Sequence, residues 1–159
     1  MLKILRSGIR GKFYRVIRNM YKDCVSCIKY DGKLSETFAC DTGVKQGDVF
    51  SPNLFNLYIN DLSKIFEGDT DSPKLHGEEY IHCLLYADDL VLLSLTEEGL
   101  QGKLNKLHEY CKRWSLSINP KKTQVMKMSK NSCELPKSKL YIGQALLEWT
   151  KSCHTSTLV

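Results

Sequence analysis

The sequence predicts an α+β domain with a mainly antiparallel sheet and helices packed on one face of it. Strand-like and helix-like segments follow one another without the strict alternation that a parallel sheet requires. Tight-turn signals recur between short apolar runs, which indicates hairpins. The 159 residues are 42% apolar and 26% charged, a composition and length that suit one domain with its own core.

The first predicted element is an amphipathic helix over residues 2–22. Its apolar residues recur at helical spacing: Leu2, Leu5, Ile9, Phe13, Val16, Ile17 and Met20. The same span is rich in arginine and lysine and holds no acid. Mitochondrial presequences share this composition, but Gly8 and Gly11 weaken the helix and serine is scarce. No uninterrupted apolar stretch follows the first basic residues, so a secretory signal is not expected.

Residues 25–42 predict a β-hairpin with strands at 25–30 and 36–40. Asp31 and Gly32 stand between the two apolar runs, and Asp-Gly is a strong signal for a tight hairpin turn.

A glycine-bracketed loop over residues 43–48 precedes the second predicted helix. Ser51 predicts the N-cap of this helix and Pro52 its first helical position. The helix has a wide apolar face, made by Leu54, Phe55, Tyr58, Ile59, Leu62, Ile65 and Phe66. The polar residues 67–79 are then expected to form a loop.

Two adjacent aspartates interrupt the most hydrophobic segment of the chain, IHCLLYADDLVLLSL at residues 81–95. The segment predicts strands at 81–86 and 90–94, with Ala87, Asp88 and Asp89 as the turn. Two interpretations of the aspartates stay open. They are turn formers facing water, or they are ligands that converge on a hard divalent cation.

A third helix is predicted from Thr96, which stands at the N-cap position, with Glu97 and Glu98 at the positive end of the helix dipole. An apolar stripe follows in steps of three and four residues, which indicates core packing: Leu100, Leu104, Leu107, Cys111 and Trp114.

Asn119 and Pro120 end the third helical segment. A strand over 124–130 and a hairpin over 141–149, turning near Gly143, are expected after it. The last ten residues carry no pattern that predicts structure.

The formal net charge is +5, and the basic residues gather in two runs near the two ends of the chain, around a more acidic centre. This distribution suits a polyanionic partner, although solvated element faces produce similar runs. Seven cysteines at irregular spacing favour a reducing, intracellular compartment, nuclear or cytoplasmic. Cys24 and Cys27 form an isolated CxxC, a weak signal for a metal or redox site. No apolar run has the length of a membrane span, so no membrane association is expected.

Three stretches together resemble the reverse transcriptases of non-LTR, LINE-type retrotransposons. They are GVKQGDVFSPNLFNLYINDL (43–62), LLYADDLVLLS (84–94) and YCKRWSLSINPKKTQVM (110–126). The aromatic-Ala-Asp-Asp hairpin alone is a weak signal, but the three motifs in this order are a strong one. The resemblance implies a palm-type sheet. It divides the chain into a partial palm domain over 1–149 and an unassigned tail over 150–159.

The resemblance also implies a two-metal site for RNA-directed DNA synthesis. Asp88 would ligate Mg²⁺, with Mn²⁺ possible, and Asp89 would act as a second ligand or as support. The partners implied are an RNA template, a DNA primer and deoxynucleoside triphosphates. Further residues match family positions near nucleotide or template: Gly43, Lys45, Gln46, Gly47, Tyr86 and Lys122. Taken alone, these residues fit an ordinary loop, a sheet-filling aromatic and one lysine of a basic run.

The chain departs from the family at its start. The family places a further catalytic aspartate on a strand that would precede Met1, and residues 1–22 contain no acid to replace it. We therefore expect a fragment of a polymerase that is inactive by itself. The alternative is a non-catalytic, nucleic-acid-binding remnant of a retrotransposon.

Overall fold

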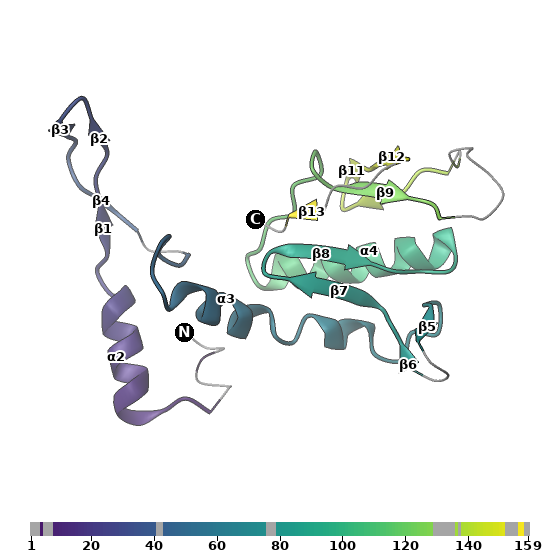
Figure 1. Cartoon of the computed structure of the whole chain (residues 1–159), viewed down its shortest axis with the longest axis horizontal. Coiled ribbons are helices and arrows are strands. Elements are labelled where there is room, and N and C mark those ends of the chain that lie inside the picture. The colour runs from purple at the N-terminus through teal and green to yellow at the C-terminus, as the bar shows by residue number, and fades with distance from the viewer. Residues whose placement is uncertain are drawn as a thin grey trace. The chain divides into compact units, whose positions relative to one another are not determined.

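The computed structural model describes residues 4, 8–40, 43–75, 79–128, 136, 138–151 and 156–157. The chain divides into two compact units, Met1–Asn60 and Asp61–Val159, and each is described here by itself. Helices and small sheets alternate along both units (Figure 1), so the α+β class is confirmed. In the described part of the chain, one strand pair is parallel and the others are antiparallel. A continuous palm-type sheet and a single domain over 1–149 stay predictions.

The predicted N-terminal helix is shorter than expected. Helix α2 spans Gly11–Tyr21 and begins at a glycine with φ +67°. Residues 8–10 are not helical, and Gly8 adopts φ +86°. Glycine visits positive φ readily, so the two glycines interrupt the helix that the apolar spacing predicted from residue 2. The remainder of the predicted start lies outside the described residues.

The core of the first unit joins α2 to helix α3, which spans Ser51–Ile59. Ile17 is 1% exposed, and it shares an apolar cluster with Ile4 and Leu54. Several half-buried side chains surround this cluster: Ile9, Tyr14, Tyr21, Phe50 and Leu57. The cluster fixes α2 and α3 against each other within the unit.

The predicted hairpin after α2 is confirmed, as a two-part arm. Strand β1 (Val25–Ser26) pairs antiparallel with β4 (Phe38–Ala39), and β2 (Lys29–Tyr30) pairs antiparallel with β3 (Lys33–Leu34). The turn residues Asp31 and Gly32 both have positive φ, +47° and +73°, which is the pattern of a type I′ turn. All eight strand residues of the arm are exposed.

The helix predicted from residue 51 differs in its cap and its length. Phe50 stands at the N-cap position of α3, so the prediction that Ser51 is the N-cap is wrong. The Asp48 carboxylate accepts a hydrogen bond from the Phe50 backbone N–H at 3.1 Å and satisfies one free amide there. The α-helix ends at Ile59, and a 3₁₀ helix, η1 (Ser63–Phe66), follows in the second unit.

The predicted loop over 67–79 contains an unexpected short hairpin. Strand β5 (Lys74–Leu75) pairs antiparallel with β6 (Glu79–Tyr80). These strands are short and mostly exposed, so they leave no alternating apolar pattern in the sequence. The Asp-Asp hairpin follows as β7 (Cys83–Tyr86) and β8 (Asp89–Leu92).

Helix α4 spans Glu97–Arg113 and confirms the third predicted helix. The Thr96 hydroxyl accepts a hydrogen bond from the Gly99 backbone N–H at 3.0 Å, as expected of an N-cap. The predicted stripe packs in the core of the second unit, with Leu104, Leu107 and Cys111 buried. In Figure 1 the β7–β8 hairpin crosses in front of this helix.

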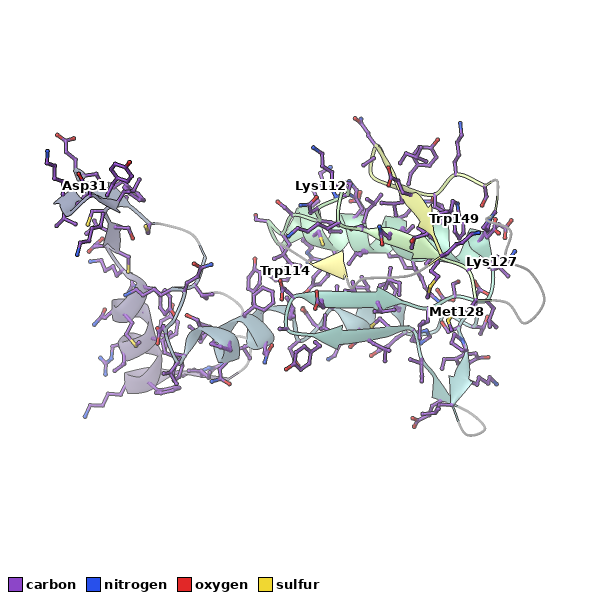
Figure 2. The ribbon with its side chains drawn as sticks, turned by 45° about the horizontal axis from the view of Figure 1, so that its top comes forward. Asp31, Lys112, Trp114, Lys127, Met128 and Trp149 are labelled. Atoms are coloured by element: carbon purple, nitrogen blue, oxygen red, sulfur yellow. The ribbon has the colours of Figure 1, made fainter. Side chains whose placement is uncertain are left out.

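The C-terminal strands confirm the expected hairpin and add two pairings that the sequence did not predict. Strand β10 (Tyr141–Ile142) pairs antiparallel with β11 (Ala145–Leu146), with Gly143 at φ +59° in the turn. Strand β9 (Gln124–Met126) pairs in parallel with β12 (Glu148–Thr150). Trp149 of β12 lies opposite Val125 of β9, and Figure 2 shows Trp149 and Lys127 at this end of the unit.

A third strand, β13 (Ser156–Thr157), pairs antiparallel with β8 and makes the order β13-β8-β7. The tail that carried no sequence pattern thus contributes a strand. Within the described ranges, no helix is long and apolar enough to cross a bilayer.

Candidate functional site

The Asp-Asp hairpin closes more tightly than the sequence predicted. Tyr86 of β7 pairs directly with Asp89 of β8, so only Ala87 and Asp88 form the loop. Asp89 is therefore the first residue of β8 and not a turn residue. Both aspartates are half-buried. The register places the two carboxylates on consecutive residues at the closed end of the hairpin.

The tight turn forces Ala87 into an unfavourable backbone conformation. Its φ is +51°, whereas Asp88 keeps a negative φ. Positive φ at the first loop residue alone is the pattern of type II′ turns, which favour glycine at that position. A side chain in the left-handed region costs about 1–2 kcal/mol. Strain of this kind concentrates at functional sites, which favours a role for the turn beyond chain reversal.

The donor set at the turn suits a hard cation that takes most of its ligands from elsewhere. Carboxylate oxygens are the ligands that Mg²⁺ prefers, and it commonly uses one or two of them together with water and phosphate oxygens. Among the described residues, no group of three or more His, Cys, Asp and Glu side chains could hold a metal ion. The role of Asp88 and Asp89 as Mg²⁺ ligands stays a prediction, of an open site that takes its other ligands from water and phosphate.

Strand β8, which begins at Asp89, is the middle strand of its three-stranded sheet. It pairs with β7 on one side, and on the other side with β13, where Thr157 lies opposite Asp89. Leu90, the residue after Asp89, is 5% exposed and belongs to the core of the second unit. The strand is thus fixed by hydrogen bonds along both edges and by an apolar anchor next to the carboxylates.

A buried lysine fixes the open end of the same hairpin. Lys103 of α4 is 0% exposed, and its ammonium group donates to three oxygens: the Asp71 carbonyl at 2.6 Å, the Ser72 hydroxyl at 2.6 Å and the Leu93 carbonyl at 2.5 Å. Burial lowers the pKa of Lys103, and the charges of Asp69 and Asp71 oppose this shift. The three acceptors come from the segment before the hairpin and from the residue that follows β8.

Further hydrogen bonds join both strands of the hairpin to this lysine. The Leu93 N–H donates to the His82 carbonyl at 2.9 Å, which pairs the residues just outside β8 and β7. The His82 imidazole shares a hydrogen bond of 2.8 Å with the Ser72 hydroxyl. Ser72 in turn accepts from Lys103, so one ammonium group connects to both strand ends.

Asp71 attaches the same segment to the start of α4. Its carboxylate accepts hydrogen bonds from the hydroxyls of Ser94 and Thr96, and these bonds, Ser94 first, lower the pKa of Asp71 against the effect of desolvation. A Cβ at Gly99 would overlap this carboxylate, so the close approach requires glycine there.

Sequence reasoning missed Lys103, although a signal was present. The residue stands three positions after Leu100 and four before Leu107, both members of the predicted apolar stripe. Helical periodicity therefore placed a lysine on the buried face of α4. A lysine at such a position needs polar partners, and the sequence does not say which segment supplies them.

The glycine-bracketed loop is held by the side chains of Tyr21 and Ser51, a role that the sequence did not predict for either residue. The Tyr21 hydroxyl donates to the Asp48 carboxylate at 3.3 Å and lies 3.2 Å from the Ser51 hydroxyl. Ser51 donates to the Lys45 carbonyl at 2.5 Å. The Lys45 ammonium lies 5.6 Å from the centre of the Tyr21 ring. Tyr21 and Ser51 therefore fix the backbone on which the predicted nucleotide-binding residues stand.

The predicted loop residues are exposed. Gly43 and Gly47 adopt φ +87° and +80°, which explains glycine at both positions, and no protein atom lies within 4 Å of a Cβ added to either. Lys45 and Gln46 present their side chains to solvent. The loop and the Asp-Asp hairpin belong to different units.

Tyr86 and Lys122 are exposed as well. Tyr86 is 84% exposed beside the aspartates, so the alternative that it merely fills the sheet is wrong. Lys122 lies in the turn after Pro120, where its backbone N–H donates to the Asn119 carbonyl at 3.1 Å. The structure brings Tyr86, Asp88 and Asp89 together at one hairpin end. The nucleotide-binding role of each of these residues stays a prediction.

Comparison with known proteins identifies the class of protein that carries this hairpin. Residues 3–154 match the family described as "Reverse transcriptase (RNA-dependent DNA polymerase)". The match covers most of the chain, and the chain therefore belongs to the reverse transcriptase family.

The more similar relatives come from insect mobile elements. The Pol polyprotein of the type-2 retrotransposable element R2DM of Drosophila melanogaster is 31% identical over 142 residues, covering 87% of this chain and 13% of that protein. An R2 element protein of Nasonia vitripennis is 38% identical over 84 residues, covering 53% of this chain and 8% of that protein. A probable RNA-directed DNA polymerase from transposon BS of Drosophila melanogaster is 31% identical over 120 residues, covering 70% and 12%.

These relatives confirm the resemblance to non-LTR retrotransposon reverse transcriptases. The chain spans no more than 13% of the length of the three proteins named.

Replacement of Lys103 tests the anchor at the open end of the hairpin. We expect Lys103→Met to lower the free energy of unfolding by about 2–4 kcal/mol, because the buried Ser72 hydroxyl and the half-buried carbonyls of Asp71 and Leu93 lose their donor. Wild-type stability should also rise with pH between the lowered pKa of Lys103 and its ordinary value, since the unfolded chain binds the proton more tightly there. Urea unfolding at several alkaline pH values measures both effects.

Lys112→Met is the matched control for this experiment, because Lys112 is an exposed lysine of the same helix (Figure 2). It should change stability by less than about 0.5 kcal/mol. Equal losses in the two variants, or an alkaline rise that survives in Lys103→Met, would contradict the anchor.

Replacement of Ala87 tests the strain in the turn. We expect Ala87→Gly to raise the free energy of unfolding by up to about 1 kcal/mol, because glycine relieves the strain of the left-handed conformation. The greater backbone entropy of glycine in the unfolded chain offsets part of this stabilisation. Ala145→Gly, in strand β11, should instead destabilise by about 0.5–1 kcal/mol. Thermal unfolding of both variants measures the contrast, and destabilisation by Ala87→Gly would argue against strain at this turn.

Proposed function

We propose that this chain is palm sequence of an RNA-directed DNA polymerase, with Asp88 and Asp89 as its metal-binding carboxylates. The observation that carries the proposal is the Asp-Asp turn: two consecutive, half-buried carboxylates at the closed end of a hairpin whose loop has two residues. Membership of the reverse transcriptase family supports the same assignment. The central sheet formed around β8 would be part of a larger palm-type sheet.

The hairpin offers its carboxylates in a rigid arrangement that suits nucleotidyl transfer. Mg²⁺ or Mn²⁺ bound by Asp88 and Asp89 would supply Lewis-acid activation of a primer hydroxyl and charge neutralisation of the leaving pyrophosphate. The protein's own contribution is position. Ladder hydrogen bonds on both edges of β8 and the buried Leu90 fix the backbone at Asp89, directly after Asp88, so the backbone that carries the carboxylates needs little ordering on binding.

The proposed substrates are an RNA template, a DNA primer and deoxynucleoside triphosphates. Tyr86 is exposed next to the carboxylates and can stack on a base or sugar. Lys45 and Lys122 carry exposed positive charge for phosphate groups, and Gln46 offers an amide for a base edge. Gly43 and Gly47 leave the loop backbone without side-chain cover at two points, which permits a close approach by a nucleotide.

A nucleic-acid-binding role without catalysis is the second candidate, and helix α2 favours it. Four basic side chains at and within this helix are exposed: Arg10, Lys12, Arg15 and Arg18. Residues 1–22 contain no acid that would neutralise them. Such a surface attracts phosphates regardless of whether the aspartates hold a metal.

Metal binding at the turn separates the two candidates. We expect Mn²⁺ to broaden the backbone NMR signals of residues 86–90 selectively, because the ion is paramagnetic and sits at the carboxylates. Asp88→Asn should weaken this effect by at least about tenfold in Mn²⁺ concentration, since one of two charged ligands is lost.

Asp31→Asn is the matched control, because Asp31 also lies in a two-residue hairpin turn (Figure 2). Broadening near residues 86–90 should be unchanged in that variant. Uniform broadening over all exposed carboxylates, or no effect of Asp88→Asn, would leave only the candidate that binds nucleic acid without a metal.

We further propose that residues 1–159 alone bind a primer–template duplex but do not extend the primer. The family's site uses a third carboxylate besides Asp88 and Asp89, and two carboxylates position the metal ions less well than three. Positioning of the ions is the main protein contribution to this reaction. Fluorescence anisotropy should show binding that weakens with salt. Arg15→Ala/Arg18→Ala should reduce the slope of log K against log salt by about two.

The control double variant is Lys64→Ala/Lys112→Ala, which removes the same charge from exposed positions in the second unit. Its salt slope should stay close to that of the wild type. Primer extension by the chain with Mg²⁺ or Mn²⁺ would overturn the proposed inactivity. Failure to bind duplex at low salt would overturn the proposed nucleic-acid role.

A further inference from the structure

Two cysteines face each other at the base of the exposed arm formed by β1 to β4. The β1–β4 register pairs Val25 with Ala39 and Ser26 with Phe38. When this register is continued by one residue in each strand, toward the base of the arm, Cys24 lies opposite Cys40. The Cys40 backbone N–H donates to the Cys24 carbonyl at 2.8 Å, so the antiparallel ladder continues through this pair.

The register assigns both cysteines of this pair to one face of the ribbon. Residues directly opposite in an antiparallel pair project to the same side, as do residues two apart along a strand. The Cys40 thiol donates to the Ser26 hydroxyl at 3.1 Å, so Cys40 shares the face of Ser26. Strand alternation assigns Cys24 to the same face. Both cysteines are half-buried and form no disulfide. The Cys24 thiol donates to the Met20 carbonyl at 3.3 Å, a bond that it must leave to reach Cys40.

The spacing of the pair is compatible with a covalent bond. In a hydrogen-bonded antiparallel pair the Cα atoms lie about 5.5 Å apart. Disulfides span Cα separations of about 4.4–6.8 Å. The Cβ atoms of such a pair are somewhat further apart than the disulfide optimum, and a bond formed there is expected to be easily reduced.

Cys27 cannot compete for Cys24 while β1 is formed. Val25 and Ser26 are extended, and three extended residues separate the two Cα atoms by about 10 Å. That exceeds the limit of about 7 Å for a disulfide. Strand alternation also places Cys27 on the opposite face from Cys24. The CxxC pattern in the sequence is therefore not a redox pair in this fold.

We propose that Cys24 and Cys40 form a reversible disulfide when the protein meets a small disulfide oxidant such as oxidised glutathione. One thiolate of the pair attacks the glutathione disulfide, and one glutathione leaves as a thiol. The second thiolate then attacks the mixed disulfide and releases the other glutathione. In sum, two protein thiols lose two electrons and two protons, and one oxidised glutathione becomes two reduced molecules.

The bond would fasten an element that has little else to hold it. Every strand residue of the arm is exposed, and a two-stranded ribbon is marginally stable by itself in water. Closing the chain between residues 24 and 40 removes freedom from the opened arm. Gly43, the start of the candidate nucleotide-binding loop, follows only three residues after Cys40. Oxidation would thus stiffen the arm next to that loop.

Peptide mapping of the full chain tests the proposal. The protein is equilibrated with reduced and oxidised glutathione, alkylated, digested with trypsin and analysed by mass spectrometry. Trypsin separates residues 23–29, which hold Cys24 and Cys27, from residues 34–45, which hold only Cys40. We expect these two peptides to be linked, with Cys27 alkylated, and the link to disappear on reduction.

Two variants assign the link to its cysteines. It should persist in Cys27→Ser and be lost in Cys24→Ser. In urea the link should fall by about fivefold or more at the same glutathione ratio, because the ladder no longer holds the two thiols together.

Three results would overturn the proposal. They are a bond within residues 23–29, a link that persists in Cys24→Ser, or a yield of the 24–40 link in native protein no higher than in urea. Since none of these readouts involves metal or nucleic acid, failure here leaves the proposed polymerase function untouched.

Discussion

The buried ammonium group of Lys103 is the constraint on which the second unit depends. It sits on the apolar face of α4 and has no exposed surface, so it must find oxygen partners inside the protein. It finds them in the segment at Asp71 and Ser72 and in the residue after β8. One side chain thereby connects α4 to the residue after β8, ten positions earlier, and to Ser72 and Asp71, which lie 31 and 32 positions earlier.

This anchor explains how the Asp-Asp hairpin keeps its shape. The open end is held by Lys103 and its partners, and the middle by Leu90 in the core. The closed end carries the strain of Ala87 and the two carboxylates. Stable packing at one end of a short hairpin can hold an unfavourable turn at the other, and charged groups at such a turn suit a ligand better than they suit stability.

The first unit is stabilised differently. Polar side chains position its loop, and its β1–β4 arm is exposed. Tyr21 and Ser51 hold the 43–48 loop through hydrogen bonds, while the β1–β4 arm has no buried strand residue. The arm depends on its ladder and its type I′ turn. A cross-strand thiol pair at its base therefore affects an element with few other contacts to stabilise it.

The sequence by itself determined the α+β class, the tight turns and most helix and strand positions, because these depend on local signals such as Asp31-Gly32 and the Thr96 cap. It also identified Asp88 and Asp89 as candidate metal ligands. Only the tertiary structure decided the β9–β12 pairing, the partners of Lys103 and the register that sets Cys24 opposite Cys40. Those features join residues that are distant in sequence, and a local sequence pattern does not specify which distant residue will contact it in the folded protein.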